Sequence, residues 1–160
     1  GSSTADHGRN ITSQNEEDII KYLKHYSTKN NLQFYLLTGE EDNGTTTSVS
    51  KQYELFSNAK IVVGPHGGVM SNLIFLDPAK KPKVIEFSPV KGRTFSKLFH
   101  GAIDQFAEYY EIPYIIPEQI LQKIDRKNDK TTIRQQAINL MKHIDCSIDL
   151  LELKKILPEA

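Results

Sequence analysis

The residues of this chain that are best suited to chemistry lie in a short glycine-rich segment near its middle. The run Ile61-Val62-Val63 is continuous and β-branched, which is typical of a buried parallel strand. It leads into Gly64-Pro65-His66-Gly67-Gly68, and the pattern that follows predicts a helix over 69–76 that ends before Asp77-Pro78. Glycines in such a turn can adopt positive φ and let a ligand approach the backbone closely.

A strand, a glycine-rich turn and a helix in this order favour an anionic ligand. Backbone amides at the start of a helix, together with its dipole, attract a group such as phosphate. His66 lies at the mouth of the predicted strand, where it can donate to a phosphate oxygen or take part in proton transfer. Ser71 and Asn72 fall in the first helical turn, where they can reach the same ligand or cap the helix.

A purely structural interpretation of this segment is also open. The glycines then make only a tight turn, His66 bonds to the backbone, and Asn72 holds the loop. The string is neither the dinucleotide-binding Gly-x-Gly-x-x-Gly nor a phosphate-binding P-loop.

No second segment carries a recognisable site. The single cysteine, Cys146, excludes an internal disulfide and a cysteine-rich zinc site, and no Gly-x-Ser-x-Gly elbow of a serine hydrolase is present. The remaining histidines lack the paired spacing of metal ligands: His7, His25, His100 and His143. Three tyrosines are predicted to belong to the core rather than to a base-stacking platform: Tyr109, Tyr110 and Tyr114.

Alternating strands and helices must position the glycine-rich turn. Ser13-Gln14-Asn15-Glu16 has the form of a capping box and predicts a helix over 14–29. Further helices are predicted over 51–57 and from Thr94 to about Tyr110. Short apolar runs predict strands at 32–37, 61–63, 83–87 and 112–116.

This alternation indicates an α/β fold with a Rossmann-like parallel sheet and helices on both faces. Beyond Pro117 the pattern is helical only, with apolar stripes that end near Leu157. We therefore expect a tail over 1–12, an α/β domain over 13–117 and a helical C-terminal extension over 118–160.

Composition limits the classes of partner. The chain has 160 residues, with 20 Lys plus Arg balanced by 20 Asp plus Glu, so it lacks the basic excess of a general nucleic-acid binder. No apolar run approaches the length needed to span a membrane, so we expect no span in this chain.

The literal string around the turn resembles the signature of glycosyltransferase family 61, which has Gly-x-His-Gly-Ala followed by a spaced Asn and Phe. Here the string runs from Asn58 to Leu76, and Val84-Ile85-Glu86 resembles the family's next strand. More weakly, Arg9 followed by Asn15-Glu16 resembles its Arg…Asn-Glu element, so that the resemblance covers about 9–116. Gly68 replaces the usual Ala, Ser71 stands where Thr is common, and 1–8 lacks the hydrophobic strand that usually precedes the Arg.

The resemblance implies the C-terminal, nucleotide-holding half of a two-domain GT-B-like inverting glycosyltransferase. Such an enzyme moves a sugar such as N-acetylglucosamine or xylose from a nucleotide diphosphate to a hydroxyl of a glycan or protein. It also implies a missing N-terminal domain, and hence a fragment that is inactive alone. The expected compartment is the secretory lumen for a eukaryotic source, and the cytoplasm or a membrane surface for a bacterial one.

By the same resemblance, the glycine-rich turn is the diphosphate pocket. His66, Gly67 and Ser71 would line it beside Gly64 and Gly68, and Asn72 would brace the loop. Arg9 would neutralise phosphate charge, for which a bidentate guanidinium is well suited.

Glu86 would accept the ribose hydroxyls, unless it only caps the helix at Thr94 or faces water. His66 is also a possible catalytic base. The resemblance implies no metal or other cofactor, because GT-B folds usually do not need one, and the nucleotide diphosphate sugar is the donor substrate. The alternative is a non-catalytic α/β binding or interaction module that kept the fold.

Overall fold

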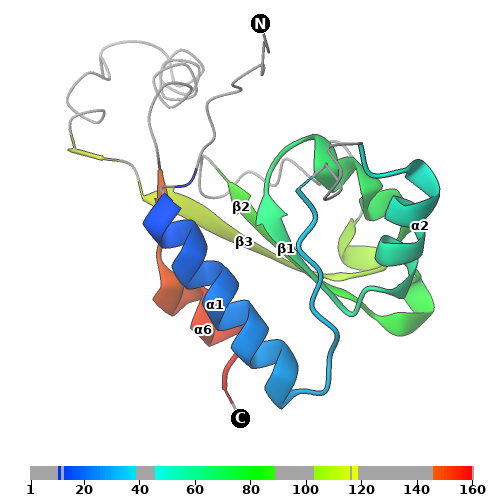
Figure 1. The fold of residues 1–160 in the computed structure, drawn as a ribbon, viewed down its shortest axis with the longest axis horizontal. Helices are drawn as coiled ribbons and strands as arrows, with labels where there is room; N and C mark the ends of the chain where they lie inside the picture. Colours follow the sequence, from blue (N-terminus) through cyan, green and yellow to red (C-terminus); the bar gives the residue numbers. More distant parts are fainter. Residues whose placement is uncertain are drawn as a thin grey trace, which may run out of the picture.

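The computed structural model of the chain describes residues 11, 13–38, 46–88, 103–115, 117–118 and 146–159. Its N-terminal half begins with two helices that precede the first strand (Figure 1). The elements in chain order are α1 (Ser13–Lys29), α2 (Val49–Asn58), β1 (Ile61–Pro65), the 3-10 helices η1 (Gly68–Phe75) and η2 (Pro78–Lys80), β2 (Lys83–Ser88), the 3-10 helix η3 (Ile103–Gln105), β3 (Glu108–Ile115), β4 (Ser147–Ile148) and α6 (Leu150–Ile156).

The sheet has the order β1-β2-β3-β4. The first three strands run parallel, with Gly64 of β1 opposite Glu86 of β2 and Glu86 opposite Glu111 of β3. The short strand β4 is antiparallel and pairs with the end of β3. The α/β class predicted from the alternation of elements is therefore confirmed, as are the strands predicted at 61–63 and 83–87.

Helical elements cover both faces of the sheet. Successive strand residues point to opposite faces, and on β2 the buried Val84 and Ile85 enter two different core clusters. Ile85 packs with α1 and α6 through Ile19, Tyr22 and Leu153. Val84 instead packs with α2 and η1 through residues that include Phe56, Met70 and Leu73.

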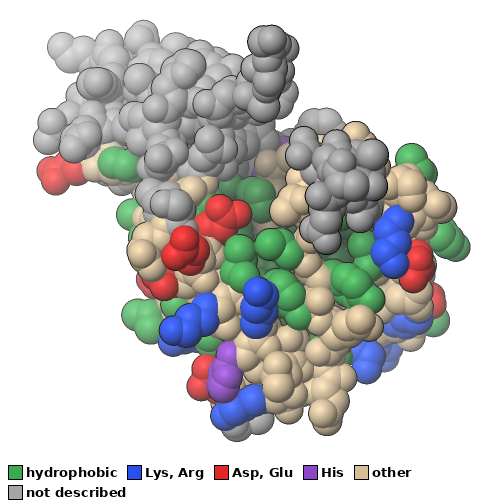
Figure 2. All heavy atoms as spheres, in the orientation of Figure 1, with side chains coloured by type: hydrophobic (Ala, Val, Ile, Leu, Met, Phe, Trp, Pro, Cys, Tyr) green, Lys and Arg blue, Asp and Glu red, His purple; other side chains and the backbone are tan. Residues whose placement is uncertain are grey.

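The predicted strand at 32–37 is wrong. Residues 32–38 have no regular secondary structure and pass between α1 and α2 (Figure 1). Their aromatic side chains pack beneath lysines instead of entering the core: Lys24 Nζ lies 5.7 Å from the Phe34 ring centroid and Lys51 Nζ 5.8 Å from that of Tyr35. Tyr35 and its neighbour Leu36 remain more than half exposed, and Figure 2 shows hydrophobic side chains on this face.

The helix predicted from Thr94 to about Tyr110 is also wrong at its C-terminal end. The single 3-10 turn η3 is followed by Glu108, whose N–H donates to the carbonyl of Pro82 at 2.9 Å and so begins the pairing of β3 with β2. The strand predicted at 112–116 therefore starts four residues earlier. Tyr109 and Tyr110 point to opposite faces of the sheet, which fits a strand. Residues 94–102 lie outside the described part of the chain.

The helix predicted over 14–29 is confirmed as α1, which ends at Lys29, and Asn31 just beyond it has a φ of 52°. Of the helical extension predicted over 118–160, the part near Leu157 is confirmed as α6, although Ile148 belongs to β4. Residues 119–145 of that extension lie outside the described part of the chain. Leu153 and Leu157 are fully buried in the same cluster as α1. Among the described residues, no helix is both long and apolar enough to cross a membrane.

Candidate functional site

His66 lies against Glu86 at the carboxyl ends of β1 and β2. The His66 N–H donates to the carbonyl of Phe87 at 2.9 Å, which extends the β1–β2 ladder by one residue. Alternation along an extended chain places the His66 side chain on the same face as Gly64, the register partner of Glu86. Nδ1 of His66 lies 2.7 Å from Oε1 of Glu86.

Glu86 is buried completely, and the His66 side chain is 13% exposed. The second carboxylate oxygen, Oε2, accepts a hydrogen bond from the phenol of Tyr109. Tyr109 is the register partner of Val84, so it sits diagonally from Glu86 on the same face, within reach of an aromatic side chain. A buried carboxylate is stable only when such donors replace water. The three side chains therefore form one hydrogen-bonded unit across three parallel strands.

This arrangement gives Glu86 partners within the sheet itself. Both of its oxygens are engaged by protein side chains, one by the imidazole and one by the phenol. The Glu86 carboxylate thus touches the glycine-rich turn through His66.

The sequence did not single out Tyr109 or Glu111 as site residues. Glu111 is the register partner of Glu86 on the same face, and one of its carboxylate oxygens is buried. Both residues were missed because the segment up to Tyr110 was predicted to be a helix instead of a strand beside Glu86. A strand assignment would have aligned positions 109 and 111 with Glu86. Across the described ranges, no three His, Cys, Asp or Glu side chains converge as metal ligands.

The glycines of the turn do not use positive φ, so that prediction is wrong. Gly67 is extended, with φ 170° and ψ −170°, and none of Gly64, Gly67 and Gly68 has a left-handed backbone. A Cβ on Gly64 would lie 3.4 Å from Cε of Met70. A Cβ on Gly67 or Gly68 would meet nothing within 4 Å in the part of the chain that the structure describes. Gly67 and Gly68 therefore leave the turn without side chains at two positions where a ligand could approach the backbone.

The helix predicted over 69–76 is present as the 3-10 helix η1, which begins at Gly68. Its first turn closes with the Met70 N–H donating to the Gly67 carbonyl at 3.0 Å. Ser71 is exposed, whereas Asn72 is half-buried and its Nδ2 donates to Oε1 of Gln52 at 2.7 Å. Asn72 thus joins η1 to α2 and so supports the glycine-rich turn that leads into η1.

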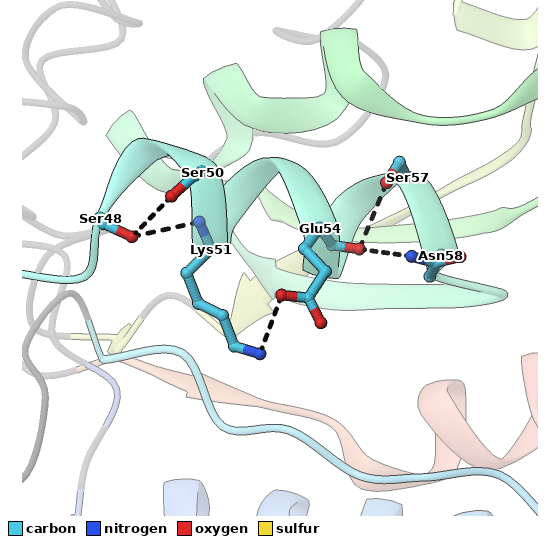
Figure 3. Close-up of polar contacts among 6 residues, drawn as sticks. All are labelled: Ser48, Ser50, Lys51, Glu54, Ser57 and Asn58. Carbon is cyan, nitrogen blue, oxygen red and sulfur yellow. Dashed lines mark hydrogen bonds and ion pairs between the residues drawn. The ribbon is translucent and has the colours of Figure 1, made fainter.

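Side-chain hydrogen bonds cap helix α2 at its start and at its end (Figure 3). At its start, the Ser48 hydroxyl accepts from the Lys51 N–H at 3.2 Å as an N-cap. At its end, the Glu54 carbonyl accepts from Ser57 Oγ at 3.3 Å and from Asn58 Nδ2 at 2.9 Å (Figure 3). Gln52 lies between these ends, and its Nε2 donates to the Thr47 carbonyl at 2.8 Å.

The structure thus brings His66 and Glu86 together beside Gly64, Gly67 and Gly68. It places Asn72 behind the turn and Ser71 on the exposed side of η1. Arg9 lies outside the described residues, so its predicted role stays a prediction.

The family model of Glycosyltransferase 61 matches residues 5–85, slightly more than half of the chain. The match includes α1, β1 and the glycine-rich turn, and it ends one residue before Glu86. No curated protein and no solved structure matches the chain.

Proposed function

Because this chain belongs to glycosyltransferase family 61, we propose that it is the donor-binding part of an inverting glycosyltransferase. The donor is a nucleotide diphosphate sugar, such as one carrying N-acetylglucosamine or xylose. The acceptor is a hydroxyl of a glycan or protein, held with the help of a further domain of a GT-B-like enzyme.

One observation carries this proposal: the His66–Glu86 pair stands beside an open glycine turn at the carboxyl ends of two parallel strands. Ligands of open α/β sheets bind beyond the carboxyl ends of the strands. The turn also opens the helix η1, whose first backbone N–H groups suit an anionic group. This arrangement supports a Rossmann-like mode of nucleotide binding.

In this proposal the diphosphate lies over Gly67 and Gly68, where a ligand meets no side chain of the turn. His66 donates to a phosphate oxygen, and Ser71 contributes its exposed hydroxyl. Asn72 keeps η1 in place through Gln52, and Glu86 takes part through its contact with His66. Arg9 adds the positive charge that balances the diphosphate.

In an inverting transfer the acceptor hydroxyl attacks the anomeric carbon from the side opposite the diphosphate. The new C–O bond forms as the bond to the diphosphate oxygen breaks, and the hydroxyl proton passes to a base. The contribution of this chain is to stabilise the departing nucleoside diphosphate, whose negative charge grows in the transition state. The proposed donors for this step are His66, Arg9 and the start of η1, without a metal ion.

The first test is nucleotide binding by the whole chain. Isothermal titration with UDP, GDP and their sugar conjugates should give a dissociation constant between about 1 μM and 1 mM for at least one of them. His66→Ala should weaken that binding by about tenfold or more, the loss of one charge-assisted hydrogen bond. His25→Ala is the matched control, because His25 is an exposed histidine of α1.

Lack of binding by every nucleotide sugar would refute the donor-binding role. Equal binding by wild type and His66→Ala would instead move the site away from the glycine-rich turn. A transfer assay with the donor that binds best then tests the enzymatic step.

A further inference from the structure

Tyr109 is tied to His66 through a carboxylate that water cannot reach. The Tyr109 phenol donates to Oε2 of Glu86, and Nδ1 of His66 lies 2.7 Å from Oε1. Glu86 has no exposed surface. Each oxygen of the Glu86 carboxylate therefore contacts a protein side chain.

The chemistry of the carboxylate dictates which nitrogen of His66 carries a proton. When Glu86 is ionised its carboxylate only accepts hydrogen bonds, and the ring nitrogen at 2.7 Å from Oε1 is then the donor. That nitrogen is Nδ1, and it carries the proton whether the ring is neutral or charged. Carboxylates that bond to a histidine in this way fix both its tautomer and its ring orientation.

We propose that Tyr109 is a positioning residue for His66: its hydroxyl holds the buried Glu86 carboxylate so that Glu86 keeps the proton of His66 on Nδ1. Without the phenol, Oε2 loses one hydrogen-bond donor in a site that has no exposed surface. The carboxylate is then held less firmly in the orientation that faces Nδ1.

The consequence concerns the ligand, and this part rests on the proposed function. With Nδ1 facing Glu86, a ligand that bonds to the ring in this proposal does so through Nε2. It accepts a hydrogen bond when the ring is neutral and donates to a phosphate oxygen when the ring is charged. Tyr109 thereby affects nucleotide binding without contacting the nucleotide.

The decisive experiment reads the tautomer directly and needs no ligand. Long-range ¹H–¹⁵N NMR spectra of the 160-residue chain are recorded above the range in which imidazole titrates, with His66→Ala used to assign the ring. We expect a pyrrole-type Nδ1 and a pyridine-type Nε2 in wild type. In Tyr109→Phe and in Glu86→Gln, the two signals should exchange types or average. A wild-type ring protonated on Nε2 would overturn the proposal, as would an unchanged tautomer in both variants.

Tyr110→Phe is the matched control. Tyr110 is the next residue on β3, faces the opposite side of the sheet, and donates to Oε1 of Glu108 at 3.3 Å. It should leave the His66 signals as they are in wild type. Tyr109→Phe keeps the ring that packs among Phe56, Leu73 and Val84, and circular dichroism establishes that each variant is folded.

Nucleotide titration then completes a double-mutant cycle with UDP as the probe. Tyr109→Phe and Glu86→Gln should each weaken binding by about tenfold, and the double variant should be no weaker than Glu86→Gln alone. Additive losses would show that Tyr109 does not act through Glu86. If wild type and all variants bind no nucleotide, the proposed function fails, yet the tautomer measurement still decides whether Tyr109 positions His66.

Discussion

Asn15 and Ile148 are joined by a reciprocal pair of hydrogen bonds, although they are 133 residues apart in the sequence. Nδ2 of Asn15 donates to the Ile148 carbonyl at 3.0 Å, and the Ile148 N–H donates to Oδ1 at 2.7 Å. The amide side chain thus imitates a neighbouring strand at the edge of β4. It fixes the first turn of α1 to the segment that leads into α6.

This pair predicts that Asn15→Ala destabilises the fold. Removal of the side chain leaves the N–H and the carbonyl of a fully buried residue, Ile148, without their partner. We expect a loss of about 2 kcal/mol in the free energy of unfolding, measured by urea denaturation. Gln14→Ala is the control, because Gln14 is exposed and bonds only to Asp18 among the described residues. A loss in Asn15→Ala no larger than that of Gln14→Ala would contradict the structural role.

Tyr22 predicts an alkaline limit to stability. Its phenol donates to the carbonyl of Leu157, and its ring is buried between α1 and α6. Burial, followed by the charges of Glu159 and Tyr26, raises the pKa of Tyr22 above its usual 10.0. As the pH rises past 10.0 the unfolded chain ionises first, so this contribution is complete below pH 10.0 and is lost as the pH rises through the folded-state pKa.

The measurement is the melting temperature of wild type and Tyr22→Phe as the pH rises from neutral to strongly alkaline. The variant should lose about 1 kcal/mol at neutral pH, because the Leu157 carbonyl loses its donor. Its stability should then fall less steeply with alkali than that of wild type. Tyr53→Phe, at a more exposed tyrosine of α2, should retain the wild-type slope. Parallel slopes for Tyr22→Phe and wild type would refute the assignment.

The sequence predicted the strands whose signal is local. Ile61-Val62-Val63 is a continuous apolar run, and 83–87 is rich in apolar residues; they form the adjacent parallel strands β1 and β2. The run at 32–37 is also mostly apolar, yet its aromatic rings lie under lysines from α1 and α2. Whether an apolar run forms a strand depends on the tertiary arrangement, because the run itself does not determine which strand it pairs with.

The candidate site was predictable residue by residue but not as a unit. His66 and Glu86 were each singled out from their positions at strand ends, but their contact depends on the register that sets Gly64 opposite Glu86. Tyr109 was predicted to belong to the core, and the periodicity of the preceding residues placed it at the end of a helix. Its hydroxyl reaches Glu86 only because β3 begins at Glu108.

Substitutions of Gly67 and Gly68 are predicted to cause no large change in the free energy of unfolding, so that they test ligand binding separately. Neither backbone is left-handed, and a Cβ at either position meets nothing within 4 Å in the described ranges. Gly68→Ala should leave stability unchanged or raise it by up to about 1 kcal/mol, since alanine restricts the unfolded chain. Gly67→Ala should also stay within about 1 kcal/mol of wild type.

Nucleotide titration distinguishes the two glycine variants. Gly68→Ala restores the residue usual in family 61 and should bind UDP as wild type does. Gly67→Ala adds a methyl group where the diphosphate is proposed to approach, and should bind about tenfold more weakly. A Gly67→Ala protein that is folded and binds normally would place the ligand elsewhere.

The hydrogen bond between Asn72 and Gln52 predicts that a residue of α2 stabilises the glycine-rich turn through η1. The Asn72 amide donates to Oε1 of Gln52 at 2.7 Å, so Gln52→Ala removes the support of η1 without touching the proposed ligand site. We expect Gln52→Ala and Asn72→Ala to weaken UDP binding to a similar extent, by about threefold to tenfold. The double variant should bind no more weakly than either one, because both remove the same contact.

Ser57→Ala is the control within α2, because the Ser57 hydroxyl bonds only to the Glu54 carbonyl among the described residues. It should bind UDP as wild type does. If Asn72→Ala weakens binding while Gln52→Ala does not, Asn72 contacts the nucleotide itself instead of bracing the turn. The two variants therefore separate the two functions that the sequence left open for Asn72, because only one of them depends on the hydrogen bond to α2.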